Sequence, residues 1–212
     1  MPKKPTGRVG PIQVTITEGR ADLRWENVKF PTEKKDIEQL VVNQFMAAMS
    51  RTGAQIKASQ NSEDDLDFTL ILPGGKIKLE LREAFYGTGA NSPPYDSRDM
   101  RIKSFSYAEQ IVAAVRDKSH YGTAMPIHLL LYITHWRFLP SETTIRLAQY
   151  LLQQARPMFE NVFFLSPIDP GQADLRVLYP SNNPLQGKKP EEFRDQWYLN
   201  LDPANWQLQQ SR

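Results

Sequence analysis

Two runs of alternating apolar and polar residues, 66–72 and 76–83, stand on either side of Pro73-Gly74-Gly75. Such runs around a proline–glycine segment predict a β-hairpin, because these residues favour the backbone angles of a tight turn. We expect one face of this hairpin to be buried, since a shift by one residue would mix polar with apolar side chains. With a two-residue turn at Gly74-Gly75, every pair on that face is apolar: Phe68 with Leu81, Leu70 with Leu79, and Leu72 with Ile77.

The opposite face of the predicted hairpin is charged. In the same register Asp67 lies opposite Arg82, and Glu80 lies diagonal to Asp67, with their Cβ atoms about 7–8 Å apart. Two carboxylates at this spacing suit one hard divalent cation, and Lys78 and Arg82 flank Glu80 on the same face. This set matches the needs of metal-assisted phosphodiester hydrolysis, in which the metal activates water and a nearby cation neutralises developing charge.

Two other interpretations of the charged face are open from the residues alone. The polar side of a hairpin is often simply solvated, and Asp67 and Arg82 would then form a surface ion pair of little energetic value. The same face can instead pack against another subunit. In that case Asp67→Asn would alter assembly or stability and no response to metal.

The remaining periodicity predicts a mixed α/β domain. Strand-like alternation and helical spacing follow one another in the order β, α, β, β, β, α, β, α, β, β. A capping-box pattern, Ser106-x-x-Glu109, predicts the start of the second helix. The expected strands are 12–17, 54–60, 66–72, 76–83, 127–134, 162–165 and 175–179, and the expected helices are 32–49, 106–118 and 141–155.

The 212 residues of the chain fit one domain of ordinary size with appended segments. We expect a flexible arm at 1–11, an α/β domain at 12–180 and a Pro/Gln-rich extension at 181–212 that docks on the domain. The formal net charge of +2 excludes a protein that coats nucleic acid by bulk charge. The lack of cysteine excludes disulfides and thiolate metal sites. With no readable signal peptide and no apolar run near the ~20 residues that a bilayer requires, we expect a soluble, cytoplasmic protein.

Helix, three strands, helix and strand follow one another between Thr32 and Thr134. Leu66-Asp67-Phe68 stands at the head of the second of these strands, and Leu79-Glu80-Leu81-Arg82 lies in the third. This arrangement resembles the PD-(D/E)XK nuclease superfamily, whose core is an αβββαβ unit with an acidic motif and an E-x-K motif at these places. The resemblance implies a restriction-endonuclease-like fold and a Mg²⁺ or Mn²⁺ cofactor. By the same match Asp67, Glu80 and the Leu81 carbonyl would bind the metal, and Glu38 would be the acidic residue that many members supply from the first helix.

The chain departs from the family pattern at one position, because Arg82 stands where the family has lysine. Arginine stays protonated, so Arg82 can stabilise a pentavalent phosphate but cannot act as a base. Lys78 shares its face and is a candidate replacement. The change also fits a member that has lost cleavage and kept binding.

These observations lead to a hypothesis of function. We expect a metal-dependent endonuclease or exonuclease that hydrolyses phosphodiester bonds of DNA, with RNA as the less favoured substrate and a homodimer as a compatible assembly. The alternative is an inactive nuclease-like module that binds nucleic acid or a protein partner. Five basic residues around the second helix are candidate contacts to backbone phosphates. They are Arg98, Arg101, Lys103, Arg116 and Lys118.

Overall fold

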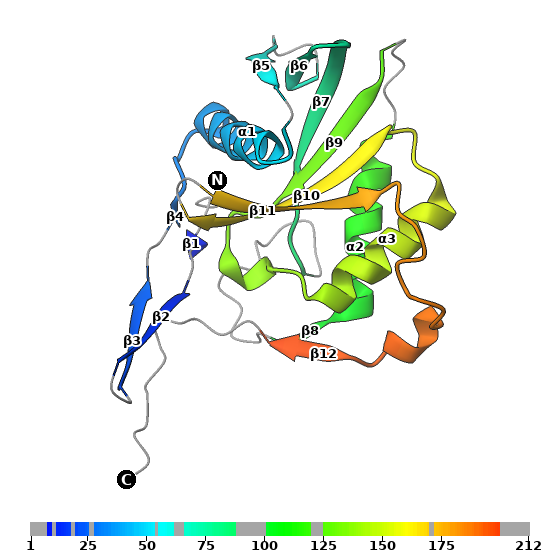
Figure 1. Cartoon of the computed structure of the whole chain (residues 1–212). Coiled ribbons are helices and arrows are strands. Elements are labelled where there is room, and N and C mark those ends of the chain that lie inside the picture. The colour runs from blue at the N-terminus through cyan, green and yellow to red at the C-terminus, as the bar shows by residue number, and fades with distance from the viewer. Residues whose placement is uncertain are drawn as a thin grey trace.

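The computed structural model describes residues 30–53, 55–61, 66–87, 101–119, 125–169 and 172–199, together with the backbone of four short strands before residue 30. A six-stranded sheet lies at its centre, with the order β11-β10-β9-β7-β6-β5 (Figure 1). The strands are β5 (Lys57–Gln60), β6 (Phe68–Leu72), β7 (Gly75–Glu83), β9 (Ile127–Tyr132), β10 (Asn161–Asp169) and β11 (Gln172–Tyr179). The sheet is mixed, because β9 runs parallel to both β7 and β10, whereas the other neighbours are antiparallel.

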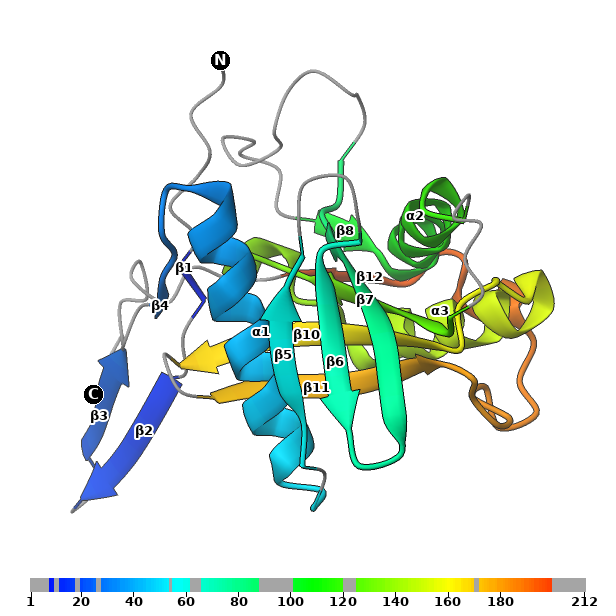
Figure 2. The ribbon, with the colours of Figure 1, turned by 90° about the horizontal axis from the view of Figure 1, so that it is seen from above.

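Three helices flank this sheet. Helix α1 (Lys34–Ser50) covers one face, and α2 (Ser104–Asp117) with α3 (Glu142–Ala155) covers the other (Figures 1 and 2). Each face has its own apolar core: Leu79 and Leu81 of β7 pack on the α1 side, whereas Leu129 and Leu131 of β9 pack on the side of α2 and α3. The predicted α/β class, with a mixed central sheet between helices, is confirmed.

Shorter elements surround the central sheet. Two small antiparallel pairs precede α1, namely β1 (Arg8–Val9) with β4 (Val28–Lys29) and β2 (Ile12–Thr17) with β3 (Arg20–Trp25). A third pair joins β8 (Arg101–Lys103) to β12 (Trp197–Leu199), and single 3₁₀ turns lie at Trp136–Phe138 and Pro190–Phe193. Most of the arm predicted at 1–11, and the end of the extension from residue 200, lie outside the described residues.

The hairpin forms, but its register differs from the prediction by two residues. Leu72 pairs with Gly75 and Phe68 with Leu79, so the turn residues are Pro73 and Gly74. Proline presets the backbone angle that the first turn position needs, which favours this turn over Gly74-Gly75. Gly75 has φ +149°, a conformation open mainly to glycine. Because side chains alternate with period two, a shift by two residues leaves both faces unchanged.

The starts of α2 and α3 differ in their capping. Ser141 accepts a hydrogen bond from the backbone N of Thr144 and caps α3, at the first residue of the helix predicted over 141–155. The predicted capping box at Ser106 is wrong, because α2 already begins at Ser104, directly after β8. Pairing of β8 with β12 sets the end of the strand, and the helix starts at the next residue. Within the described residues, no helix has the length and apolar character to cross a membrane.

Candidate metal centre

The two predicted acidic residues come together at the open end of the β6–β7 hairpin. The Phe68–Leu79 pair is the last of the β6–β7 ladder; Asp67 directly precedes β6, and Glu80 directly follows Leu79. The two carboxylates are close enough for the charge of Glu80 to raise the pKa of Asp67.

Asp67 is held by the backbone of the neighbouring strand. Its Oδ2 accepts a hydrogen bond from the backbone N of Leu81 at 2.8 Å, and its carbonyl accepts one from Asn61 at 3.0 Å. Directly before β6 begins, the Asp67 carboxylate thus accepts the hydrogen bond of the Leu81 amide in place of a backbone carbonyl. This fixes the Asp67 side chain beside the main chain between Glu80 and Arg82.

Glu80 is buried, with 3% of its surface exposed. Its Oε1 lies in an ion pair with the Nζ of Lys118, the residue that ends α2. A carboxylate at this depth requires a charged or polar partner, because desolvation of an unpaired ion costs several kcal/mol. Lys118, one of the candidate phosphate contacts, therefore lies in the carboxylate site.

Negative charge is crowded around Asp67. Its pKa is raised from the usual 3.8 to about 6, mainly by burial. The hydrogen bond from the Leu81 amide lowers the pKa, whereas the charges of Glu80 and Glu38 raise it and the charge of Lys118 lowers it slightly. Lys118 pairs with Glu80 and Lys34 pairs with Glu38, whereas Asp67 accepts a hydrogen bond from the Leu81 amide. A divalent cation would stabilise the ionised form of Asp67, and carboxylate oxygens are ligands that a hard metal ion prefers.

Glu38 contributes to this field from α1. It is buried at 6% exposure and lies 3.2 Å from Lys34 one turn earlier. Within the described part of the chain, no three acidic or histidine side chains are grouped closely enough to hold one ion. The structure therefore brings Asp67 near Glu80 and hydrogen-bonds it to the Leu81 amide, while Glu38 acts on Asp67 through its charge.

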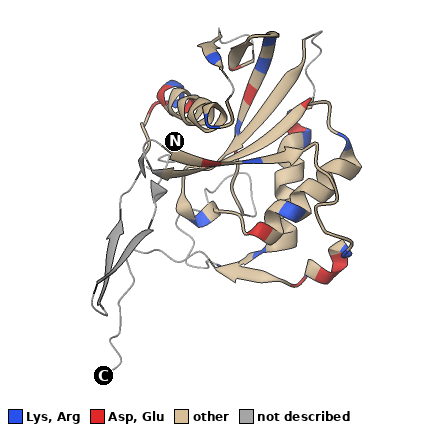
Figure 3. Cartoon of the chain, viewed as in Figure 1, with Lys and Arg blue, Asp and Glu red and all other residues tan. Residues whose placement is uncertain are grey.

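The two cations predicted on the same face as Glu80, Lys78 and Arg82, both belong to β7. Lys78 and Arg82 are both partly exposed, and charged residues follow one another along β7 (Figure 3). The Nε atom of Arg82 is buried without a hydrogen-bond partner among the residues that the structure describes. The Nε–H group of Arg82 is thus a buried donor without an acceptor. Arg82 directly follows Leu81, whose amide donates a hydrogen bond to Asp67.

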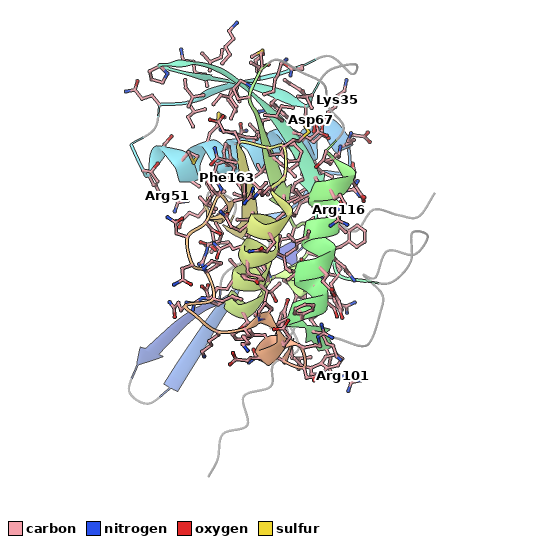
Figure 4. The ribbon with its side chains drawn as sticks, turned by 90° about the vertical axis from the view of Figure 1, so that its right-hand side faces the viewer. Lys35, Arg51, Asp67, Arg101, Arg116 and Phe163 are labelled. Atoms are coloured by element: carbon pink, nitrogen blue, oxygen red, sulfur yellow. The ribbon has the colours of Figure 1, made fainter. Side chains whose placement is uncertain are left out.

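The basic residues predicted around the second helix divide between its two ends. Arg101 and Lys103 precede α2, whereas Arg116 and Lys118 lie at its end, on the side of Asp67 (Figure 4). Arg98 lies outside the described residues. No spacing in the sequence signals that Lys118 would reach Glu80, because the contact joins the end of a helix to a strand 38 residues earlier.

Comparisons with known proteins add little to this geometry. No family model matches the chain, and no curated protein matches it. Among solved structures it is similar to Pyrococcus furiosus SfsA in complex with Ca²⁺, with a TM-score of 0.32 and 15% identity, over 78% of this chain and 75% of that chain. A likeness of this degree carries no argument about fold or function, so the site must be interpreted from its own residues.

Proposed function

We propose that the chain is a Mg²⁺- or Mn²⁺-dependent nuclease of the PD-(D/E)XK type that hydrolyses phosphodiester bonds of DNA. The observation that carries the proposal is the proximity of Asp67, whose pKa is raised to about 6 by burial and by nearby carboxylates, to the buried Glu80. Apart from the short β8, which precedes α2, the order α1, β5, β6, β7, α2, β9 supports it, since the restriction-endonuclease-like core has the αβββαβ order. DNA is favoured over RNA, as in the sequence-based hypothesis.

Asp67, Glu80 and the Leu81 carbonyl would hold the metal. A bound Mg²⁺ or Mn²⁺ polarises the phosphate and lowers the pKa of coordinated water, which is the chemistry that hydrolysis needs. The hydrogen bond from Leu81 keeps the Asp67 carboxylate oriented before a metal arrives. Glu38 would orient water through its charge at the same end of the sheet.

Positive charge in the proposed site comes from two elements. Arg82 would donate its guanidinium hydrogens to the phosphate and stabilise charge that develops on it. Lys118 is the second source of positive charge. Its ammonium contacts Glu80 and, unlike a guanidinium, can lose a proton. We infer that Lys118, from α2, takes the functional place of the lysine that the family has at position 82, in preference to Lys78.

A second candidate function follows from the same ion pair. Lys118 neutralises Glu80, so the pair can act as a purely structural contact between β7 and α2. The chain would then be an inactive nuclease-like module that binds nucleic acid or a protein. The two candidates differ in one property, the response of the site to a divalent cation.

Cleavage of supercoiled plasmid over a titration of Mg²⁺ and Mn²⁺ tests the proposal. Wild-type protein should nick the plasmid in a metal-dependent way, and Asp67→Asn and Glu80→Gln should reduce nicking to background. Glu109→Gln is the matched control, because it removes the same charge from an exposed position of α2. Equal nicking by wild type and Glu80→Gln would overturn the proposal, and DNA binding without nicking by wild type would favour the inactive module.

A further inference from the structure

Strands β5, β6 and β7 bury only one of their two faces in a core. Phe68, Leu70 and Leu79 belong to the core under α1, and no described residue of these strands belongs to the core under α2 and α3. Figure 2 shows α2 and α3 beside β7 and away from β5 and β6. Because side chains alternate, the face away from α1 carries a second set, which we call the outer hairpin face. It consists of Lys57, Ser59, Thr69, Ile71, Lys76 and Lys78.

Three exposed side chains form a row across this face near the hairpin tip. Lys57 pairs with Ile71, and Ile71 pairs with Lys76, so the row crosses β5, β6 and β7. Neighbouring strands are about 4.8 Å apart, which separates the two lysines by about 10 Å of backbone. Ile71 between them is 42% exposed. The row therefore presents two positive charges on either side of an apolar patch.

The two lysines of this row are not neutralised by an acid. Among the residues that the structure describes, neither Lys57 nor Lys76 makes an ion pair. Along β7, the first acidic side chain on this face is Glu80, four residues beyond Lys76. A lysine ammonium is a point charge that binds phosphate well. Charge complementarity therefore points to an anionic partner for the tip of the outer hairpin face.

The composition of the outer hairpin face favours duplex DNA as this partner. Its six residues include no aromatic ring, and proteins bind unpaired bases chiefly by stacking them on such rings. A duplex keeps its bases stacked inside and presents its phosphates outward, where lysines can reach them. The aliphatic side chain of Ile71 would then lie against sugar carbon atoms between two phosphates. Contacts of this kind carry no sequence information, so binding would not depend on sequence.

The same face of β7 leads from the hairpin tip to the carboxylate site. Lys76 and Glu80 are four residues apart on one strand, so they share a face and lie about 13 Å apart. This length corresponds to about four base pairs, at about 3.4 Å for each nucleotide of one strand. Glu80 is buried beside Lys118, so the face is open at the tip and covered by the end of α2 at the site. Figure 3 shows basic residues on β5 and at the tip of β7.

We propose that the outer hairpin face binds the sugar–phosphate backbone of double-stranded DNA, with Lys57 and Lys76 as phosphate contacts and Ile71 against the sugars between them. This inference deepens the proposed function and rests on it for the choice of polymer. It assigns to the hairpin tip the duplex that lies about four base pairs from the cleaved bond. The binding itself requires neither a metal ion nor cleavage.

The test is fluorescence anisotropy of a short fluorescein-labelled duplex, in buffer with chelator and no divalent metal. The double variant Lys57→Gln/Lys76→Gln should bind about tenfold more weakly than wild type at about 0.1 M salt. The slope of log K against log salt concentration should fall in magnitude by about 1.8, because each phosphate contact to a duplex contributes about 0.9. Lys188→Gln/Lys189→Gln is the matched control, since it removes the same charge from exposed residues before the Pro190–Phe193 turn. It should keep the affinity and the slope of wild type.

Further measurements test the apolar residue and the kind of partner. Ile71→Glu places a carboxylate between the two lysines and should weaken duplex binding about as much as the double lysine variant. A single strand of the same length should bind wild type more weakly than the duplex. Equal duplex binding by wild type and the double lysine variant, equal loss in the control variant, or no binding by wild type would overturn the inference. So would binding to phosphatidylserine vesicles that Ile71→Glu abolishes, because the face would then belong to a membrane surface.

Cleavage separates this inference from the proposed nuclease. Glu80→Gln should bind the duplex with the salt slope of wild type, even if it cleaves nothing. Duplex binding through Lys57 and Lys76 by a wild-type protein that cleaves no plasmid would support the inference and refute the nuclease. Metal-dependent cleavage with the same KM for wild type and the double lysine variant would support the nuclease and refute the inference.

Discussion

The two ends of α2 differ in how they hold charge. At its C-terminal end, Lys118 meets the buried Glu80 beside Asp67, where the charges are close and little water screens them. At the other end, Arg101 and Lys103 contact the half-exposed indole ring of Trp197, and Lys103 pairs with the exposed Asp195. Buried charges couple to folding and to metal, whereas exposed ones couple to binding and to salt. The two ends should therefore respond differently to the same kind of substitution.

The largest expected difference concerns the rate of cleavage. Arg82→Met should slow metal-dependent cleavage by about 100-fold or more, because the phosphate loses a preorganised donor. Affinity for DNA should change little, since one phosphate contact among several is lost. Single-turnover cleavage, with binding measured separately by anisotropy, distinguishes the two effects. Unchanged cleavage by Arg82→Met would remove this residue from the proposed mechanism.

The second prediction concerns the buried ion pair. Lys118→Met removes this cationic partner of Glu80 and should lower the free energy of unfolding by about 3 kcal/mol without metal. Mg²⁺ should restore more stability to Lys118→Met than it adds to wild type, because the divalent cation takes over the charge that Lys118 supplied. Urea denaturation with and without Mg²⁺ measures both effects. If Mg²⁺ stabilises neither protein, the ion pair is structural and the inactive module is the better account.

The third prediction is a pH dependence at Asp67. Its pKa is raised from 3.8 to about 6, so the folded protein binds more protons than the unfolded chain between these values, and stability falls as pH rises through this window. Asp67→Asn keeps an acceptor for the Leu81 amide and loses the charge. It should be about 1 kcal/mol more stable than wild type at pH 8 without metal, a value reduced because Asp67 is partly exposed.

The control for this prediction is the same comparison near pH 4. Both side chains are then neutral in the folded state, and the difference in unfolding free energy should largely disappear. A constant advantage of Asp67→Asn at both pH values would point to packing as its cause. Greater stability of wild type at pH 8 would contradict a raised pKa of Asp67.

The smallest expected effect on stability lies at the antiparallel pair of β8 and β12. Trp197→Ala should change the free energy of unfolding by no more than about 0.5 kcal/mol, because half of the side chain is in solvent and its pairing strand keeps the same backbone bonds. Thermal unfolding measures this directly. A loss of several kcal/mol would mean that Trp197 is a packing residue, which would break the contrast between the two ends of α2.

The sequence predicted the faces of the hairpin because alternation reports which side of a strand is buried. Phe68 and Leu79 must face a core, and they still do so when the register between the two strands shifts by an even number of residues. The register itself depended on the turn, where the preference of Pro73 for the first turn position outweighed a Gly74-Gly75 turn. The α/β class and the order of the main elements followed from the same periodicity.

Two features of the molecule could not be predicted from periodicity. Strands β8 and β12 have three residues each and pair across more than 90 positions of the chain, so neither gives a recognisable alternation. The contact of Lys118 with Glu80 depends on how α2 lies on the sheet, which no local pattern encodes. Contacts of this kind are set by packing between distant elements, and the structure was needed to find them.

Binding of Mn²⁺ to wild type, Asp67→Asn and Glu80→Gln, followed by the paramagnetic resonance signal of free Mn²⁺, tests the central claim most directly. The account predicts that wild type binds the ion at pH 8, that Mg²⁺ competes for the site, and that either substitution removes it. Equal binding by all three proteins, or no binding by wild type, would contradict the claim that Asp67 and Glu80 together hold a divalent cation.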